Sequence, residues 1–162
     1  MRTRQKRAIP EGWATAENLS AFTALATVTA KAKKASFISI DEAGEEALIG
    51  GDKGLASEIS IEDGKAVHEF KTEGGTVTNG LYWPKGTVLA TSTGKVNVYA
   101  GEEKAASFDS HAGAANAVAL HPSGEILASV GVDKSYILYD LTDFTVLTQV
   151  YTESGQSTDL SE

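Results

Sequence analysis

Three side chains in the last third of the chain, His111, Ser129 and Asp133, have the chemistry of a hydrolytic triad. A serine hydrolase needs a serine activated by histidine, a carboxylate that orients the histidine, and donors that stabilise the oxyanion. The sequence contains no G-x-S-x-G segment, the turn that exposes the nucleophile in many hydrolases. We therefore expect no catalysis by these residues. A hydrolase that uses Ser129 stays as an alternative, which a serine-directed covalent probe would detect.

Other residues that could carry chemistry lack the spacing that chemistry requires. The chain has no cysteine, and so no thiolate zinc site and no thiol nucleophile. His68, His111 and His121 do not have the spacing of metal ligands, so we expect no metal and no cofactor. Paired acidic residues fall in predicted turns, where they are typical of solvated surface: Glu45-Glu46, Glu62-Asp63 and Glu102-Glu103.

The elements that position these residues belong to a globular chain with uneven charge. It has 162 residues, 41% hydrophobic residues and a net charge of −8, which fits one domain with a core. No apolar run approaches the roughly 20 residues that span a bilayer, so we expect no membrane contact. Residues 1–34 carry seven basic and two acidic side chains, whereas the remaining residues carry seven basic and twenty acidic ones. An acidic body repels phosphate, so we expect it not to bind nucleic acid directly. The basic start RTRQKR is either a nuclear import patch or a solvated terminus.

The body is built from three copies of a unit of about 40 residues, the length of one propeller blade. Ile59, Tyr99 and Tyr139 follow one another at intervals of 40. Copies two and three also match at five positions with an offset of 38, namely Phe70 and Phe108, Gly75 and Gly113, Trp83 and His121, Pro84 and Pro122, and Gly86 and Gly124. From this match we expect copy two to lack two residues in its second tight turn.

The third copy predicts four strands separated by turns. We expect them at Ala117–Leu120, Ile126–Val130, Tyr136–Tyr139 and Val146–Tyr151. The turns are His121-Pro-Ser-Gly124 and Gly131-Val-Asp-Lys134, which contain residues that favour turns. The fold class we predict is all-β: a partial propeller of about three four-stranded antiparallel blades.

The third copy resembles the WD repeat of β-propellers, through Ser110-His111-Ala112-Gly113, HPSGEILAS and GVDKSYILYD. Tyr139-Asp140 stands where that family has Trp-Asp, and Tyr99-Ala100 and Ile59-Ser60 are weaker matches. The resemblance implies that His111, Ser129, Asp133 and Tyr139 form a buried structural network. Copy two keeps only Thr91 of this set, with Glu73 in the histidine position, and copy one has Asp52 and Lys31 near the corresponding positions.

A closer resemblance is to the propeller of the fungal pre-mRNA-processing factor nineteen family, which comprises splicing factors that are also U-box ubiquitin ligases. It rests on KRAIPEGWATAENL, GGTVTNGLYW and SFDSHAGAANAVALHPSGEILASVGVDKSYILYDLT. It implies a nuclear protein of mRNA splicing, ubiquitin ligation and DNA repair, which docks partner or substrate proteins through propeller loops. A WD-repeat scaffold without a splicing role is the alternative. We see no U-box in the sequence, and so expect no ubiquitin transfer by this chain.

We divide the chain into an N-terminal basic segment, residues 1–34, and a partial propeller, residues 35–162. The blades are expected at about 35–72, 73–110 and 111–152, with 153–162 as the start of a fourth. The first segment is compatible with a short helix over Ala16–Ala24 with Thr15 as its cap. Trp13 either pins this segment to the domain or anchors a partner. Three blades would leave two apolar faces bare, so we expect the isolated chain to associate with itself.

Overall fold

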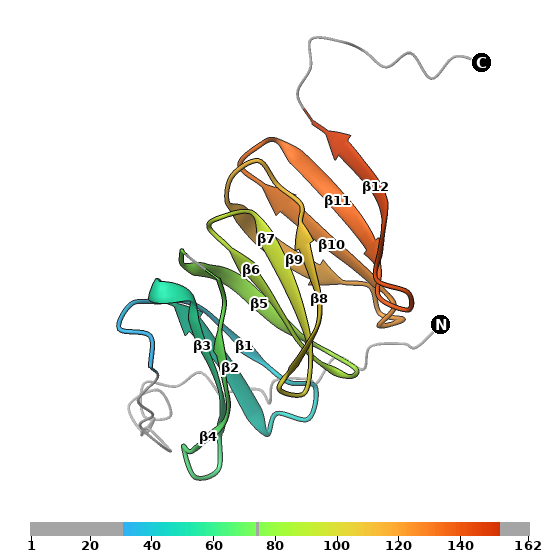
Figure 1. The fold of residues 1–162 in the computed structure, drawn as a ribbon. Coiled ribbons are helices and arrows are strands. Elements are labelled where there is room, and N and C mark those ends of the chain that lie inside the picture. Colours follow the sequence, from blue (N-terminus) through green and yellow to red (C-terminus); the bar gives the residue numbers. More distant parts are fainter. Residues whose placement is uncertain (1–30, 74, 153–162) are drawn as a thin grey trace, which may run out of the picture.

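The computed structural model describes residues 31–73 and 75–152, which fold into three four-stranded antiparallel sheets (Figure 1). The first sheet contains β1 (Ala35–Ile40), β2 (Glu46–Gly51), β3 (Leu55–Ser60) and β4 (Ala66–Lys71), with a short 3-10 turn, η1 (Asp52–Gly54). The second contains β5 (Val77–Trp83), β6 (Gly86–Thr91), β7 (Lys95–Ala100) and β8 (Glu103–Asp109). The third contains β9 (Ala115–Leu120), β10 (Ile126–Gly131), β11 (Ser135–Asp140) and β12 (Thr145–Tyr151).

The three sheets stand side by side in chain order, with the second sheet between the other two (Figure 1). The first strand of the second sheet, β5, contacts the first strands of both neighbours, β1 and β9. Within each sheet, consecutive strands are neighbours joined by turns. This is the arrangement of blades in an unclosed β-propeller, so the predicted fold class is confirmed. Trp13, the helix expected over Ala16–Ala24 and residues 153–162 lie outside the described residues.

The register of the strand pairs repeats every 40 residues. In the middle of each sheet, β2 pairs with β3, β6 with β7 and β10 with β11. The equivalent pairs are Leu48–Glu58, Val88–Val98 and Ala128–Leu138, and then Gly50–Ala56, Ala90–Val96 and Val130–Tyr136. Paired residues lie on the same side of a sheet, so each set forms part of one face. We call the face that carries these residues the front face, and the opposite one the rear face.

This register corrects one expectation from the sequence. The hairpins β6–β7 and β10–β11 enclose turns of the same length, because both follow the 40-residue spacing. The two extra residues of the third copy lie earlier, in the turn between β9 and β10. There His121 and Ile126 close a longer turn, whereas Trp83 pairs with Gly86 directly across Pro84 and Lys85. The alignment of Pro84 with Pro122 and Gly86 with Gly124 therefore placed the difference in length in the wrong turn.

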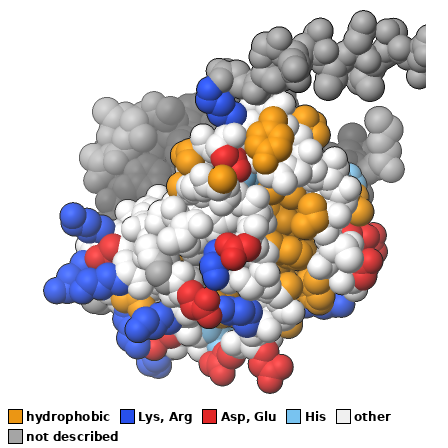
Figure 2. Space-filling view, turned by 45° about the horizontal axis from the view of Figure 1, so that its top comes forward, with side chains coloured by type: hydrophobic (Ala, Val, Ile, Leu, Met, Phe, Trp, Pro, Cys, Tyr) orange, Lys and Arg blue, Asp and Glu red, His pale blue; other side chains and the backbone are white. Residues whose placement is uncertain are grey.

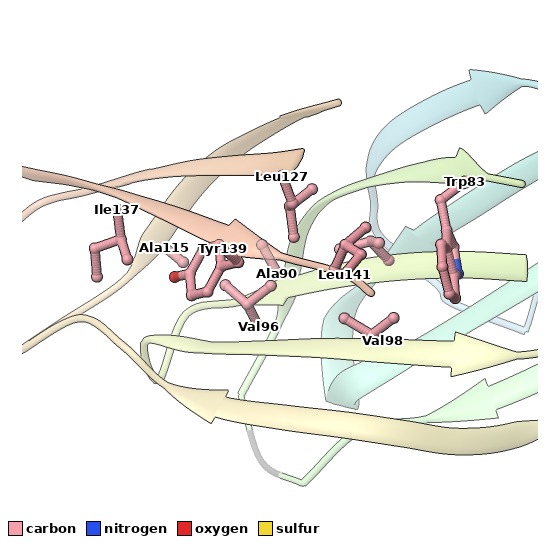
Figure 3. Packing of buried hydrophobic residues seen from close by; sticks show 10 residues of the cluster. Trp83, Ala90, Val96, Val98, Ala115, Leu127, Ile137, Tyr139 and Leu141 are labelled. Atoms are coloured by element: carbon pink, nitrogen blue, oxygen red, sulfur yellow. The ribbon is translucent and has the colours of Figure 1, made fainter. Parts of the chain in front are cut away.

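The core lies between the front face of one sheet and the rear face of the next. Val88, Ala90, Val96 and Val98 on the front of the second sheet have no exposed surface, and they pack with Leu127, Ile137 and Tyr139 of the third sheet (Figure 3). A second cluster joins the first and second sheets through Leu48, Ala56, Phe70, Val77, Leu89 and Tyr99. An aromatic pair lies in each interface: the ring centroids of Phe70 and Tyr99 are 4.8 Å apart, and those of Phe108 and Tyr139 are 4.6 Å apart.

The sequence predicted two bare apolar faces, and the structure shows exposed apolar side chains on both of them. On the front of the third sheet, Val130 and Tyr136 are 44% and 36% exposed, although their counterparts Ala90 and Val96 are fully buried. Val150, which pairs with Tyr136 on the same face, is also exposed. On the rear of the first sheet, Ile38 and Ile40 of β1 are 66% and 59% exposed, whereas Ala47, Ser57 and Ile59 are buried.

Replacement of Leu127 by alanine tests the interface between the second and third sheets. Leu127 is fully buried there, so Leu127→Ala should lower the free energy of unfolding by about 2–5 kcal/mol. Leu147 on β12 is 51% exposed, and Leu147→Ala should change it by less than about 1 kcal/mol. Urea denaturation of both variants measures the difference. Equal losses would contradict this packing.

Candidate functional site

The four residues that the sequence singled out come together on the rear side of the third sheet. His111 lies in the loop between β8 and β9, Ser129 on β10, Asp133 in the turn between β10 and β11, and Tyr139 on β11. The 40-residue repeat places Ser129 and Tyr139 on the face that packs against the second sheet. The side chains of His111 and Asp133 are 0% and 7% exposed, so the group is almost entirely shielded from water.

The side chains form a continuous chain of hydrogen bonds. His111 Nδ1 lies 3.0 Å from Asp133 Oδ1, and its Nε2 lies 2.7 Å from Ser129 Oγ. Ser129 Oγ is in turn 2.8 Å from the Tyr139 hydroxyl. If the imidazole donates from Nδ1 to the carboxylate, its Nε2 accepts a hydrogen bond from the Ser129 hydroxyl. The Ser129 oxygen in turn accepts a hydrogen bond from the Tyr139 hydroxyl. All four polar groups are satisfied in this arrangement, which is what burial requires.

A fifth member, Ser135, was missed by the sequence interpretation. Its hydroxyl lies 3.0 Å from His111 Nδ1 and donates to Asp133 Oδ1 over 2.8 Å, and its backbone N–H also donates to Asp133. An aspartate whose side chain caps the backbone two residues later is a common turn signal. The sequence Asp-Lys-Ser at 133–135 could therefore have revealed it.

Asp133 ties the loop before β9 to the turn after β10. Its Oδ2 accepts a hydrogen bond from the Ala112 backbone N–H over 3.0 Å. Burial alone would raise its pKa, but the hydrogen bonds from Ser135, the Ala112 backbone and His111 prevail and lower the pKa to about 2. Gly131 is required beside this group, because a Cβ there would lie 2.4 Å from His111 Nδ1.

The geometry favours a structural role over hydrolysis. A nucleophilic serine needs an open path by which the carbonyl carbon of a substrate can reach its hydroxyl oxygen. Ser129 is only 1% exposed, and its hydroxyl is held between His111 and Tyr139. Burial raises the pKa of Tyr139, so the phenol remains a neutral donor at physiological pH. The arrangement holds a loop against a sheet.

The corresponding positions of the second sheet do not form such a network. Strand pairing places Leu89, and not Thr91, at the position of Ser129. The Thr91 hydroxyl instead hydrogen-bonds the backbone of Lys95. Glu73 lies on the surface, where its carboxylate oxygens are 3.4 Å from Lys95 Nζ and 3.8 Å from Lys104 Nζ. The Tyr99 hydroxyl is buried with no hydrogen-bond partner among the described residues, and Leu89, at the position of Ser129, has no polar atom to offer it.

The first sheet likewise keeps its candidate residues apart. Asp52 accepts a hydrogen bond from the Lys34 backbone over 3.0 Å, and Lys31 forms an ion pair with Glu69. The interface between the first and second sheets has a different polar connection that the sequence did not reveal. Glu58, 5% exposed, accepts from the Thr87 hydroxyl and lies 2.6 Å from His68 Nδ1. A glutamate within a strand of small and apolar residues was the signal for it.

The described residues contain no group of three or more His, Cys, Asp or Glu that could hold a metal ion. In the same part of the chain, no helix is long and apolar enough to cross a membrane. His68, His111 and His121 lie in separate places, and the His121 imidazole hydrogen-bonds Ser123 in the β9–β10 turn. Neither models of protein families nor curated proteins match this chain. The fold therefore defines the class, an unclosed β-propeller of about three blades.

Removal of the Ser129 hydroxyl tests the network. Ser129→Ala leaves His111 Nε2 and the Tyr139 hydroxyl without their partner, and should cost about 1–3 kcal/mol of the free energy of unfolding. Asp133→Ala should cost a similar amount. Ser36→Ala, at an exposed position, should change stability by less than about 0.5 kcal/mol. Unchanged stability in both network variants, together with the loss of a hydrolytic activity, would overturn the structural role.

The low pKa of Asp133 predicts acid sensitivity. Because the folded pKa is about 2 and the ordinary value is 3.8, the carboxylate stabilises the fold above about pH 4. This contribution is lost as the pH falls from 4 towards 2. Asp133→Asn should be less stable than the wild type at pH 7, and the difference should shrink over that acidic range. Urea denaturation at pH 7, 4 and 2 measures it, and a constant difference would contradict the assignment.

Proposed function

We propose that this chain is a protein-docking module of a nuclear complex that combines pre-mRNA splicing with ubiquitin ligation. The proposal rests on the resemblance of three segments to the propeller of the pre-mRNA-processing factor nineteen family. It is supported by the fold class, because propellers present loops around a rigid ring and serve mainly in binding.

One observation carries the docking role: the buried network fixes the loop before β9 at the rim of the third sheet. The imidazole of His111 is inside, whereas the next residue, Ala112, is exposed. Val132, in the adjacent turn, is 55% exposed. A Cβ added at Gly113 would lie 2.6 Å from Val132, so the two loops are in contact. Together they present a small apolar surface whose backbone is already ordered, which lowers the entropic cost of binding.

Affinity purification from a nuclear extract tests this function. We expect the wild-type chain to enrich splicing proteins, and Val132→Asp to lose them because a carboxylate cannot be buried in an apolar contact. Val67→Asp is the control, since Val67 is similarly exposed but lies on β4 of the first sheet. Splicing proteins that are absent, or that bind both variants equally, would contradict the proposal. If the wild type enriches other proteins and Val132→Asp loses them, the result would favour a WD-repeat scaffold without a splicing role.

We also propose that the isolated chain associates with itself through the front of the third sheet. Ala90 and Val96, at the equivalent positions of the second sheet, are fully buried against a neighbouring blade, and Phe108 is half-buried. Here, in contrast, Val130, Tyr136 and Val150 are exposed. Figure 2 shows hydrophobic side chains gathered on the right of the view, the side of the third sheet. Exposed apolar patches of this kind drive association.

Light scattering of charged variants tests the association. Val130→Lys with Tyr136→Lys should increase the monomer fraction, because two ammonium groups oppose burial of this face. Ala105→Lys with Ser107→Lys, at exposed positions of β8 in the second sheet, adds the same charge away from both open faces and should leave the association unchanged. A wild-type chain that is a monodisperse monomer would contradict this proposal.

A further inference from the structure

The first sheet separates its charges between its two ends. At one end lie the start of β1, the η1 turn and the end of β4, with four exposed lysines: Lys33, Lys34, Lys53 and Lys71. We call these four residues the lysine edge. At the other end, the turns β1–β2 and β3–β4 carry Asp41, Glu42, Glu45, Glu62 and Asp63, with Lys65 as the only described basic residue of those turns. A chain with a net charge of −8 thus presents one concentrated positive end.

Backbone hydrogen bonds hold the segments of the lysine edge together. The Asp52 N–H donates to the Lys34 carbonyl over 3.1 Å, so the start of β1 lies against the η1 turn that contains Lys53. The Thr72 N–H donates to the Gly54 carbonyl over 2.8 Å, and Leu55 pairs with Lys71. The positions of these lysines are therefore set by the sheet. Figure 2 shows Lys and Arg side chains gathered at the left of the view, the side of the first sheet.

The carboxylates nearest in sequence are already engaged. Asp52 accepts from the Lys34 backbone, Glu69 pairs with Lys31, and Glu73 faces Lys95 and Lys104. Among the described residues, none of the four lysines of the edge has a carboxylate within 4.0 Å. Within the described part of the chain, no direct ion pair therefore neutralises these lysines, and their charge exceeds that of Asp52, whose partner is the uncharged Lys34 N–H.

We propose that the lysine edge binds an acidic, extended peptide segment of a partner protein. Neighbouring strands are about 4.8 Å apart, so the edge spans roughly 15 Å from the start of β1 to the end of β4. An extended segment of about five residues, at about 3.3 Å per residue, covers that distance. This inference goes beyond the proposed function and does not depend on it, because it uses only the charges of the first sheet.

The same features disfavour nucleic acid as the ligand. Residues 31–36, 52–55 and 71–73 contain no aromatic side chain on which bases could stack. A long phosphate backbone would also meet the acidic remainder of the protein, whereas a short peptide feels mainly the charges within about 10 Å.

Fluorescence anisotropy with labelled hexaglutamate tests the proposal on the full chain. The wild type should bind hexaglutamate more tightly than labelled hexathymidylate, and the binding should weaken as salt is raised. Lys34→Glu with Lys71→Glu should weaken it about tenfold, because two attractive charges become repulsive. Lys65→Glu with Lys85→Glu is the matched control: it has the same net charge, lies away from the edge, and should change binding less than twofold.

Circular dichroism checks that each variant keeps its strands. If the charge reversal unfolds the chain, Lys34→Gln with Lys71→Gln replaces it, with an expected loss of about threefold. Wild-type protein that does not bind hexaglutamate would overturn the proposal. So would equal losses in the two charge-reversed variants, and tighter binding of hexathymidylate would assign the edge to nucleic acid instead.

Discussion

The packing of one sheet's front face on the next sheet's rear face is the constraint on which the rest of this structure depends. No sheet of four strands buries enough apolar surface alone, so each needs a neighbour on at least one face. The repeat of 40 residues provides this neighbour. Residues on the front face of one sheet, such as Val88 and Val98, pack against residues on the rear face of the next, such as Leu127 and Tyr139. The second sheet is covered on both sides and holds most of the fully buried residues.

Each interface also contains one buried polar connection, and the two differ. Between the second and third sheets, the His111 network binds a loop to the sheet through side chains that satisfy one another. Between the first and second sheets, Glu58 reaches Thr87 across the interface and His68 within its own sheet. Buried polar groups with defined partners fix one relative placement of two apolar faces, which hydrophobic contact alone does not specify. The order of the loop before β9 follows from the first of these connections.

The sequence predicted the fold well because turn residues and strand residues recur at a fixed period. The interval between Ile59, Tyr99 and Tyr139 is also the interval of the strand register, so the blades could be anticipated. Thr91 was matched with Ser129 wrongly, because Pro84 and Pro122 align turns of different length. The sequence marks Glu58 as a charged residue within a strand of small and apolar ones, but it could not predict the partner, because Thr87 is in another sheet. The lysine edge was hidden for the same reason: only the topology brings Lys34, Lys53 and Lys71 to one end.

Nuclear Overhauser spectroscopy of the chain with labelled Phe and Tyr rings tests the central packing most directly. The centroids of Phe70 and Tyr99, and those of Phe108 and Tyr139, are less than 5 Å apart although about 30 residues separate the members of each pair. Sheet-on-sheet packing predicts a cross-peak between the rings of each pair. Strands that are intact by circular dichroism, without either cross-peak, would show that the sheets do not pack face to face and would contradict the account.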